Sequence, residues 1–198
     1  MNLPNKLTVS RFVLTALLLV ALLGPIPGGR TAALVFFIVA GLTDYLDGRI
    51  ARARRLITNF GILMDPLADK VLICTVFIAL VEHGRIGPAA EVQVQAWMAI
   101  LVVTRELTIT GLRLLAAAQN VVLAAERYGK HKTVSQIVAL IALLALAARG
   151  EWPEWLQAIF LPWLPWFARV ALWVAVGLTV SSGAMYLWRN RDLYLKDV

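Results

Sequence analysis

The stretch TDYLDGRIARARRLITNFGILMDPLADK, from Thr43 to Lys70, decides how this chain is interpreted. It contains four aspartates, Asp44, Asp47, Asp65 and Asp69, in a sequence that is otherwise strongly apolar. A single aspartate at the centre of a membrane-spanning helix costs about 2.5–3.5 kcal/mol on insertion scales. Four of them so close together therefore indicate a functional site.

The composition around this stretch is that of a helical membrane protein. Of the 198 residues, 60% are hydrophobic and only 16% are charged, and the mean hydropathy is +0.76. Apolar runs of about 20 residues, long enough to cross the hydrocarbon layer as helices, recur along the chain. We expect an all-α, polytopic membrane protein with one domain over residues 1–198. The net charge of +7 fits basic loops facing anionic lipid, and no pattern typical of a nucleic-acid partner occurs.

Six transmembrane helices are predicted, with a short N-terminal interfacial helix formed by MNLPNKLTVSR before the first. Glycine- and proline-rich breaks and the arginine run separate the spans. The spans are Leu7–Leu23, Arg30–Ile50, Asn59–Val81, Val94–Ala118, Thr133–Ala148 and Phe167–Trp188.

The distribution of lysine and arginine predicts the orientation. One set of loops and helix ends carries Lys6, Arg11, Arg49, Arg52, Arg54, Arg55, Arg127, Lys130, Lys132, Arg189, Arg191 and Lys196, whereas the opposite set carries only Arg30, Arg85 and Arg149. Basic residues accumulate in cytoplasmic loops, so we expect both termini and the aspartates on the cytoplasmic side. Tryptophans before the last span predict an interfacial segment at the outer surface; they are Trp152, Trp155, Trp163 and Trp166.

The aspartates fall at two matched levels of a predicted helical hairpin. Asp44 and Asp47 are three residues apart, and Asp65 and Asp69 are four apart, so each pair shares one helix face. With a turn near residues 54–58, Asp44 matches Asp69 in depth and Asp47 matches Asp65. Ligation by carboxylate oxygens alone selects Mg²⁺ or Mn²⁺ over zinc, and two such divalent cations would balance four carboxylates. Pairing with the intervening arginines is the alternative, but it would not explain the matched spacing.

The pattern Asp44-x2-Asp47-Gly48-x2-Ala51-Arg52-x8-Gly61-x3-Asp65-x3-Asp69 resembles the signature of the CDP-alcohol phosphotransferases at every fixed position. The resemblance implies six transmembrane helices, a homodimer and a site open to the cytoplasm. It implies two divalent cations on the four aspartates, with Asp69 also acting as the general base and CMP as the leaving group. It also places the CDP group of the donor against Gly48, Arg52, Gly61 and Asp47.

Further segments resemble bacterial members of this family that take CDP-diacylglycerol as donor and sn-glycerol 3-phosphate as acceptor; they are NLPNKLTVSR, MDPLADK, RELTITGLR, GKHKT and YLWRNRDLYLKD. This implies the formation of phosphatidylglycerol phosphate and CMP in the bacterial cytoplasmic membrane. The cations Arg113, Lys130 and Lys132, with Arg105 as a further candidate, suit the acceptor phosphate. The alternatives are loop anchoring for Lys130 and Lys132, and an ion pair between Arg105 and Glu106.

Two other interpretations remain at this point. Members of the same family use other acceptors and make cardiolipin, phosphatidylserine or phosphatidylinositol phosphate. Acidic residues within a membrane also occur in ion-coupled transporters. A transporter is expected to have broken helices and repeated halves, and no internal repeat is evident in this sequence.

Overall fold

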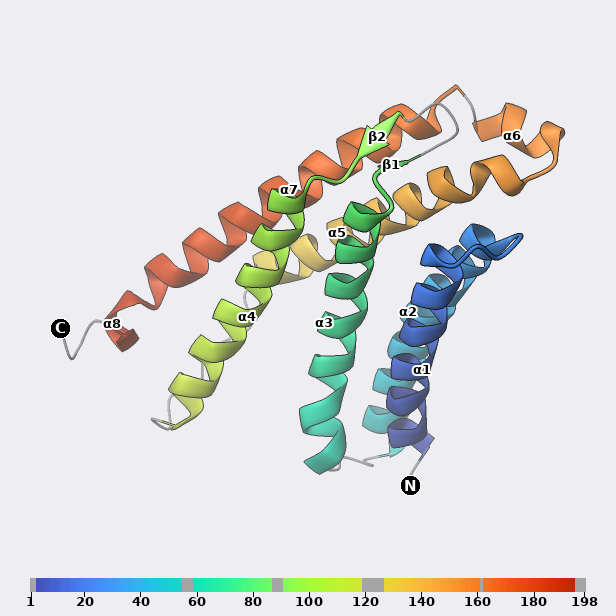
Figure 1. Ribbon diagram of the computed structural model, residues 1–198. Helices are drawn as coiled ribbons and strands as arrows, with labels where there is room; N and C mark the ends of the chain where they lie inside the picture. The colour runs from blue at the N-terminus through green and yellow to red at the C-terminus, as the bar shows by residue number, and fades with distance from the viewer. Residues whose placement is uncertain (1–2, 55–58, 87–90, 119–126, 161, 195–198) are drawn as a thin grey trace.

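The chain is almost entirely helical in the computed structural model, which describes residues 3–54, 59–86, 91–118, 127–160 and 162–194 (Figure 1). The long helices are α1 (Leu3–Leu23), α2 (Gly29–Arg54), α3 (Asn59–Glu82), α4 (Ala96–Ala118), α5 (Arg127–Ala148) and α7 (Leu164–Arg189). The short elements are the antiparallel strands β1 (Arg85–Ile86) and β2 (Val92–Gln93), the 3₁₀ turn η1 (Arg149–Glu151), and the helices α6 (Glu154–Phe160) and α8 (Arg191–Tyr194). Each predicted span coincides with one long helix.

Within the described residues, three helical stretches are long and apolar enough to cross a membrane by length and composition. They are Asn5–Leu23, His131–Glu151 and Leu164–Arg189. The other long helices, α2, α3 and α4, carry the acidic residues of the candidate site. The prediction of a helical protein with several candidate membrane-spanning helices is therefore confirmed.

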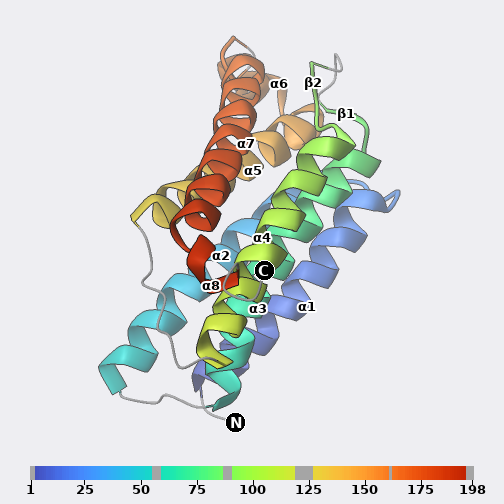
Figure 2. The ribbon, with the colours of Figure 1, turned by 90° about the vertical axis from the view of Figure 1, so that its left-hand side faces the viewer.

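Helix α1 is the centre of one half of the molecule, because it packs extensively against both α2 and α3 (Figures 1 and 2). In the other half, α7 packs against α5 and α4, and α2 also contacts α5. Helices α2 and α3 run in opposite directions, as the predicted hairpin requires, but they contact each other little, because α1 packs against both (Figure 1). Polar side chains of α1 therefore lie against acidic residues of both helices.

The predicted separate interfacial helix at the N-terminus is wrong. Residues Leu3–Leu23 form one continuous α-helix, with Pro4 in the first turn, where a missing N–H costs no hydrogen bond. Thr8 and Arg11, whose polarity suggested a position at the membrane surface, are both 0% exposed. Their polar groups are used inside the bundle.

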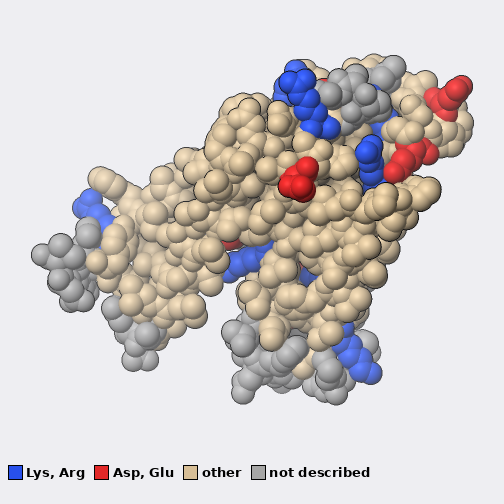
Figure 3. Space-filling model, in the orientation of Figure 1, with Lys and Arg blue, Asp and Glu red and all other residues tan. Residues whose placement is uncertain are grey.

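The end of the molecule that carries β1, β2 and α6 lies opposite the N-terminus (Figure 1). Helix α3 stops before Gly84, whose φ of 76° is a left-handed conformation that glycine adopts without strain. The buried Arg149 donates to the carboxylate of Glu91 at 2.7 Å, which fixes the strand pair to the end of α5. Most of the lysine, arginine and acidic side chains visible in Figure 3 lie towards the upper end, while the surface over the helices is largely uncharged.

The predicted tryptophan-rich segment forms α6 and the start of α7. Trp155 and Trp166 are each 67% exposed, and Trp163 packs against Phe160 and Phe167. Large aromatic side chains with exposed faces are typical of the boundary between membrane and water.

Candidate active site

The first contact of the site joins α1 to α2. Arg11 Nη1 lies 2.7 Å from Asp44 Oδ1, with the Arg11 side chain fully buried and that of Asp44 47% exposed. The buried guanidinium of Arg11 requires a partner, and Asp44 supplies one. The prediction that Arg11 is a loop cation is wrong, because Arg11 is buried within α1.

A second contact joins the same helix to α3. The Thr8 hydroxyl donates to Asp65 Oδ1 at 2.5 Å. Thr8 and Arg11 are three residues apart, so they lie on one face of α1 and hold one aspartate from each neighbouring helix. Pro66, which follows Asp65, lacks an N–H and so interrupts the hydrogen-bond ladder of α3 at this level.

Asp44 and Asp69 line one cavity of about 210 Å³, together with Arg11 and apolar side chains of α2, α3 and α5. The two aspartates that the hairpin placed at matched depth are therefore brought together. The next residue of α3, Lys70, donates to the Thr110 hydroxyl and so connects this part of α3 to α4.

The other predicted residues of the signature, Asp47, Gly48, Arg52 and Gly61, lie outside the part whose side chains the structure describes, as does Lys130. Among the described residues, no three acidic, histidine or cysteine side chains are grouped to hold a metal ion. The donor chemistry nevertheless suits Mg²⁺ or Mn²⁺, because Asp44, Asp65 and Asp69 supply only hard carboxylate oxygens.

The second group of charges lies between α4 and α5. Lys132, 2% exposed, forms an ion pair with Glu106, and Arg105 Nη1 lies 3.2 Å from the same Glu106 oxygen. Lys70, next to Asp69, donates to the Thr110 hydroxyl at 2.5 Å, which links α3 to α4. The alternative of an Arg105–Glu106 pair is thus observed, and Lys132 is a buried residue of the bundle.

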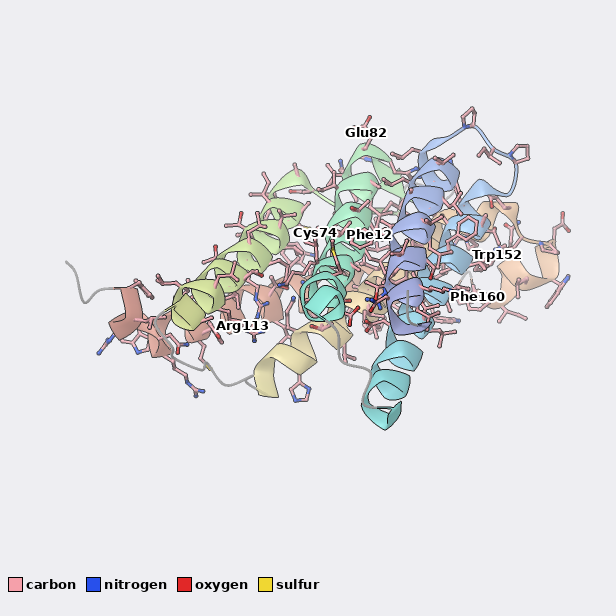
Figure 4. All side chains as sticks on the ribbon, turned by 90° about the horizontal axis from the view of Figure 1, so that it is seen from below. Phe12, Cys74, Glu82, Arg113, Trp152 and Phe160 are labelled. Carbon is pink, nitrogen blue, oxygen red and sulfur yellow. The ribbon has the colours of Figure 1, made fainter. Side chains whose placement is uncertain are left out.

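Arg113 has a different partner from the cations that share Glu106. It is exposed, its Nε donates to the Tyr186 hydroxyl at 3.4 Å, and its guanidinium carbon lies 5.7 Å from the centre of the Tyr186 ring. Viewed from below, Arg113 lies on the α4 side of α3, whereas α1 lies on the other side (Figure 4). Of the predicted acceptor residues, the structure therefore brings Arg105 and Lys132 together on Glu106 and places Arg113 nearer the end of α4.

Thr8, Arg11 and Glu106 were not among the predicted site residues. The sequence gives a partial indication for two of them, because Thr8 and Arg11 have the spacing of residues on a single helix face. The prediction of an interfacial helix placed that face in contact with water.

Comparison with known proteins agrees with these residues. The sequence profile of the CDP-alcohol phosphatidyltransferases matches residues 1–181. The chain belongs to the CDP-alcohol phosphatidyltransferase family. The match includes the whole aspartate signature and the helices α1 to α5 that surround it.

Relatives in this family match over most of the chain. A CDP-diacylglycerol–glycerol-3-phosphate 3-phosphatidyltransferase of Bacillus subtilis is 39% identical over 96% of this chain and 95% of its own length. An enzyme with the same name from Rickettsia felis is 31% identical over 93% of this chain and 93% of its own length. Another from Haemophilus influenzae is 33% identical over 70% of this chain and 73% of its own length.

Proposed function

We propose that this protein transfers the phosphatidyl group of CDP-diacylglycerol to sn-glycerol 3-phosphate and releases CMP, making phosphatidylglycerol phosphate. The observation that carries this proposal is the 39% identity, over nearly the full length of both chains, to a relative named for that reaction. The site supports it, because Asp44 and Asp69 adjoin one cavity whose other walls are largely apolar. A donor with a charged headgroup and a lipid tail requires this combination.

The aspartates are assigned to metal binding and proton transfer. Asp44, Asp47, Asp65 and Asp69 would hold two divalent cations, Mg²⁺ or Mn²⁺, which supply positive charge to the pyrophosphate of the donor. Asp69 takes the proton of the glycerol 3-phosphate 1-hydroxyl as that oxygen attacks the β-phosphorus. The P–O bond to CMP breaks as the new bond forms. Asp47, Gly48, Arg52 and Gly61 are assigned to the CDP group.

The acceptor phosphate is assigned to the cations near α4 and α5. Arg113 is exposed at the end of α4 and is available to an anionic acceptor. Arg105 and Lys132 already share Glu106, so we assign them to orienting this region as well as to the acceptor. Lys130 completes the proposed set.

The same proposal includes the membrane arrangement. We infer one domain over residues 1–198, a homodimer, and six spans formed by α1 to α5 and α7, with both termini and the site at the cytoplasmic face of a bacterial inner membrane. The basic residues support this orientation. With Arg11 and Lys132 set aside as buried partners of acids, ten of the twelve basic residues remain on the cytoplasmic side. The opposite end has four arginines, since Arg169, which donates to the Glu91 carbonyl, adds to Arg30, Arg85 and Arg149.

The test is an acceptor screen with the purified protein in detergent. Release of CMP from CDP-diacylglycerol is measured with glycerol 3-phosphate, serine, inositol 1-phosphate and phosphatidylglycerol, each with Mg²⁺, Mn²⁺ or EDTA. We expect metal-dependent turnover with glycerol 3-phosphate alone. Preference for another acceptor would agree with the chemistry of the family but show that glycerol 3-phosphate is not the acceptor. Turnover in EDTA would show that the metal assignment is wrong.

A further inference from the structure

We propose that Arg11 is a resident counter-ion of Asp44, which neutralises this carboxylate before metal binds and thereby sets the affinity of the site for divalent cations. The inference rests on the metal-binding role proposed for Asp44. It concerns a residue on α1, outside the aspartate signature.

The geometry gives Asp44 two different environments. Its Oδ1 is 2.7 Å from Nη1 of Arg11, which is fully buried, yet the Asp44 side chain is 47% exposed and adjoins the cavity that it shares with Asp69. Asp44 therefore combines a fixed partner from within the bundle with a part that a dissolved cation can reach. An arginine suits the fixed partner because its guanidinium stays charged at any pH that the protein meets.

The charges then act against each other. In the absence of metal, the guanidinium offsets the repulsion between Asp44 and Asp69, two carboxylates on one cavity. When a divalent cation approaches Asp44, the same guanidinium competes for Oδ1 and repels the ion. The pair thus stabilises the metal-free protein and weakens metal binding.

Thr8 provides the contrast within the same helix. Its hydroxyl holds Asp65 Oδ1 at 2.5 Å but carries no charge. Loss of Thr8 should misorient one carboxylate and weaken metal binding, whereas loss of Arg11 should strengthen it. A purely structural role for α1 predicts the same sign for both variants.

The experiment measures the binding of Mn²⁺ directly, from the electron paramagnetic resonance signal of the free ion, with protein in detergent. A nearby charge shifts the affinity of a carboxylate for protons by about 10–1,000-fold, so Arg11→Met should bind Mn²⁺ at least roughly tenfold more tightly than wild type. In EDTA, the unfolding midpoint of Arg11→Met should lie below that of wild type. Saturating Mn²⁺ should raise the midpoint of Arg11→Met by more than it raises the midpoint of wild type.

Three variants make the comparison specific. Arg11→Lys keeps the charge and should bind Mn²⁺ as wild type does. Arg169→Met removes an arginine at the opposite end of the molecule, where it donates to the Glu91 carbonyl, and should not change Mn²⁺ affinity. In an Asp44→Asn background, replacement of Arg11 should lower the midpoint in EDTA less than it does in the wild-type background.

The outcomes separate the two proposals. If wild type binds Mn²⁺ and Arg11→Met binds it no more tightly, the counter-ion role is wrong and the metal role stands. If wild type does not bind Mn²⁺, the metal role is wrong and the inference is overturned with it. Should Arg11→Met not fold in EDTA, Arg11→Gln is the second variant. Rescue of either by Mn²⁺ supports the proposal, and failure of both to fold with Mn²⁺ overturns it.

Discussion

Glu106 of α4 and Lys132 of α5 form a buried ion pair, and Arg105 shares the same carboxylate oxygen of Glu106. The arrangement connects α4 and α5 within the bundle. It gives Lys132 a structural partner in addition to the role in acceptor binding that we assign to it.

The first prediction separates these two roles of Lys132. Glu106→Gln should destabilise the fold by about 3–5 kcal/mol, because it leaves Lys132 charged without its main partner in the bundle. The double variant Glu106→Gln/Lys132→Met removes both charges and should recover most of that loss in thermal unfolding. If Lys132 binds the acceptor, the double variant should still show a raised KM for glycerol 3-phosphate. An unchanged KM in a folded double variant would limit Lys132 to its structural role.

The second prediction concerns Arg113, the exposed member of the proposed acceptor set. Arg113→Ala should raise the KM for glycerol 3-phosphate by roughly 10- to 150-fold, the equivalent of losing a charge-assisted contact of about 1.5–3 kcal/mol. The KM for CDP-diacylglycerol should change little.

Two controls accompany this measurement. Arg191→Ala removes another exposed arginine, which stacks on Trp188 at 4.8 Å, and should leave both constants unchanged. Tyr186→Phe deletes only the hydroxyl that accepts from Arg113 Nε and should have a smaller effect than Arg113→Ala. Equal rises in both KM values would indicate that Arg113 supports the fold instead of the acceptor.

The third prediction tests the orientation inferred from the basic residues. A reporter that is active only in the cytoplasm should work when it is fused after Val198 and fail when it is inserted after Ala90. A periplasmic reporter at the same positions should give the reverse pattern. Activity of the cytoplasmic reporter only after Ala90 would invert the topology and move the proposed site to the outer face.

The sequence predicted the helices well because apolar runs of about 20 residues between glycine- and proline-rich breaks have few alternatives in a membrane. It also placed Asp44 and Asp69 at one level, and the structure finds both at one cavity. Helix periodicity alone fixes which residues share a face, whatever tertiary contacts the helix makes.

The partners of these residues could not be predicted in the same way. Whether Arg11 lies in the inner interface or within the bundle depends on which helix its face meets, and the sequence assigned that face to water. Lys132 and Glu106, 26 residues apart, come from different helices whose relative rotation is set by packing throughout α4, α5 and α7. From the sequence alone, a basic residue near a helix end is assigned to a loop, and only the tertiary contact shows that it is buried.

The last prediction separates Asp69 from the other proposed ligands. Asp69 adjoins the cavity beside Asp44, where it can accept a proton from an incoming hydroxyl, whereas Asp65 is held by Thr8. Asparagine keeps the shape and one oxygen donor but does not accept that proton. Asp69→Asn should therefore lower turnover by at least about 10²-fold while still binding CDP-diacylglycerol in the presence of Mg²⁺.

Asp65→Asn should lose both properties, because Asp65 is assigned to hold the divalent cations on which donor binding would depend. The measurement is the binding of CDP-diacylglycerol to each purified variant with Mg²⁺ or EDTA, beside the release of CMP. Thr8→Ser, which retains the hydroxyl that donates to Asp65, serves as the control and should bind as wild type does. Turnover of Asp69→Asn near the wild-type rate would show that another group is the base. If Asp69→Asn instead fails to bind the donor as completely as Asp65→Asn, Asp69 is an essential ligand and the proton acceptor must be another residue at the same cavity.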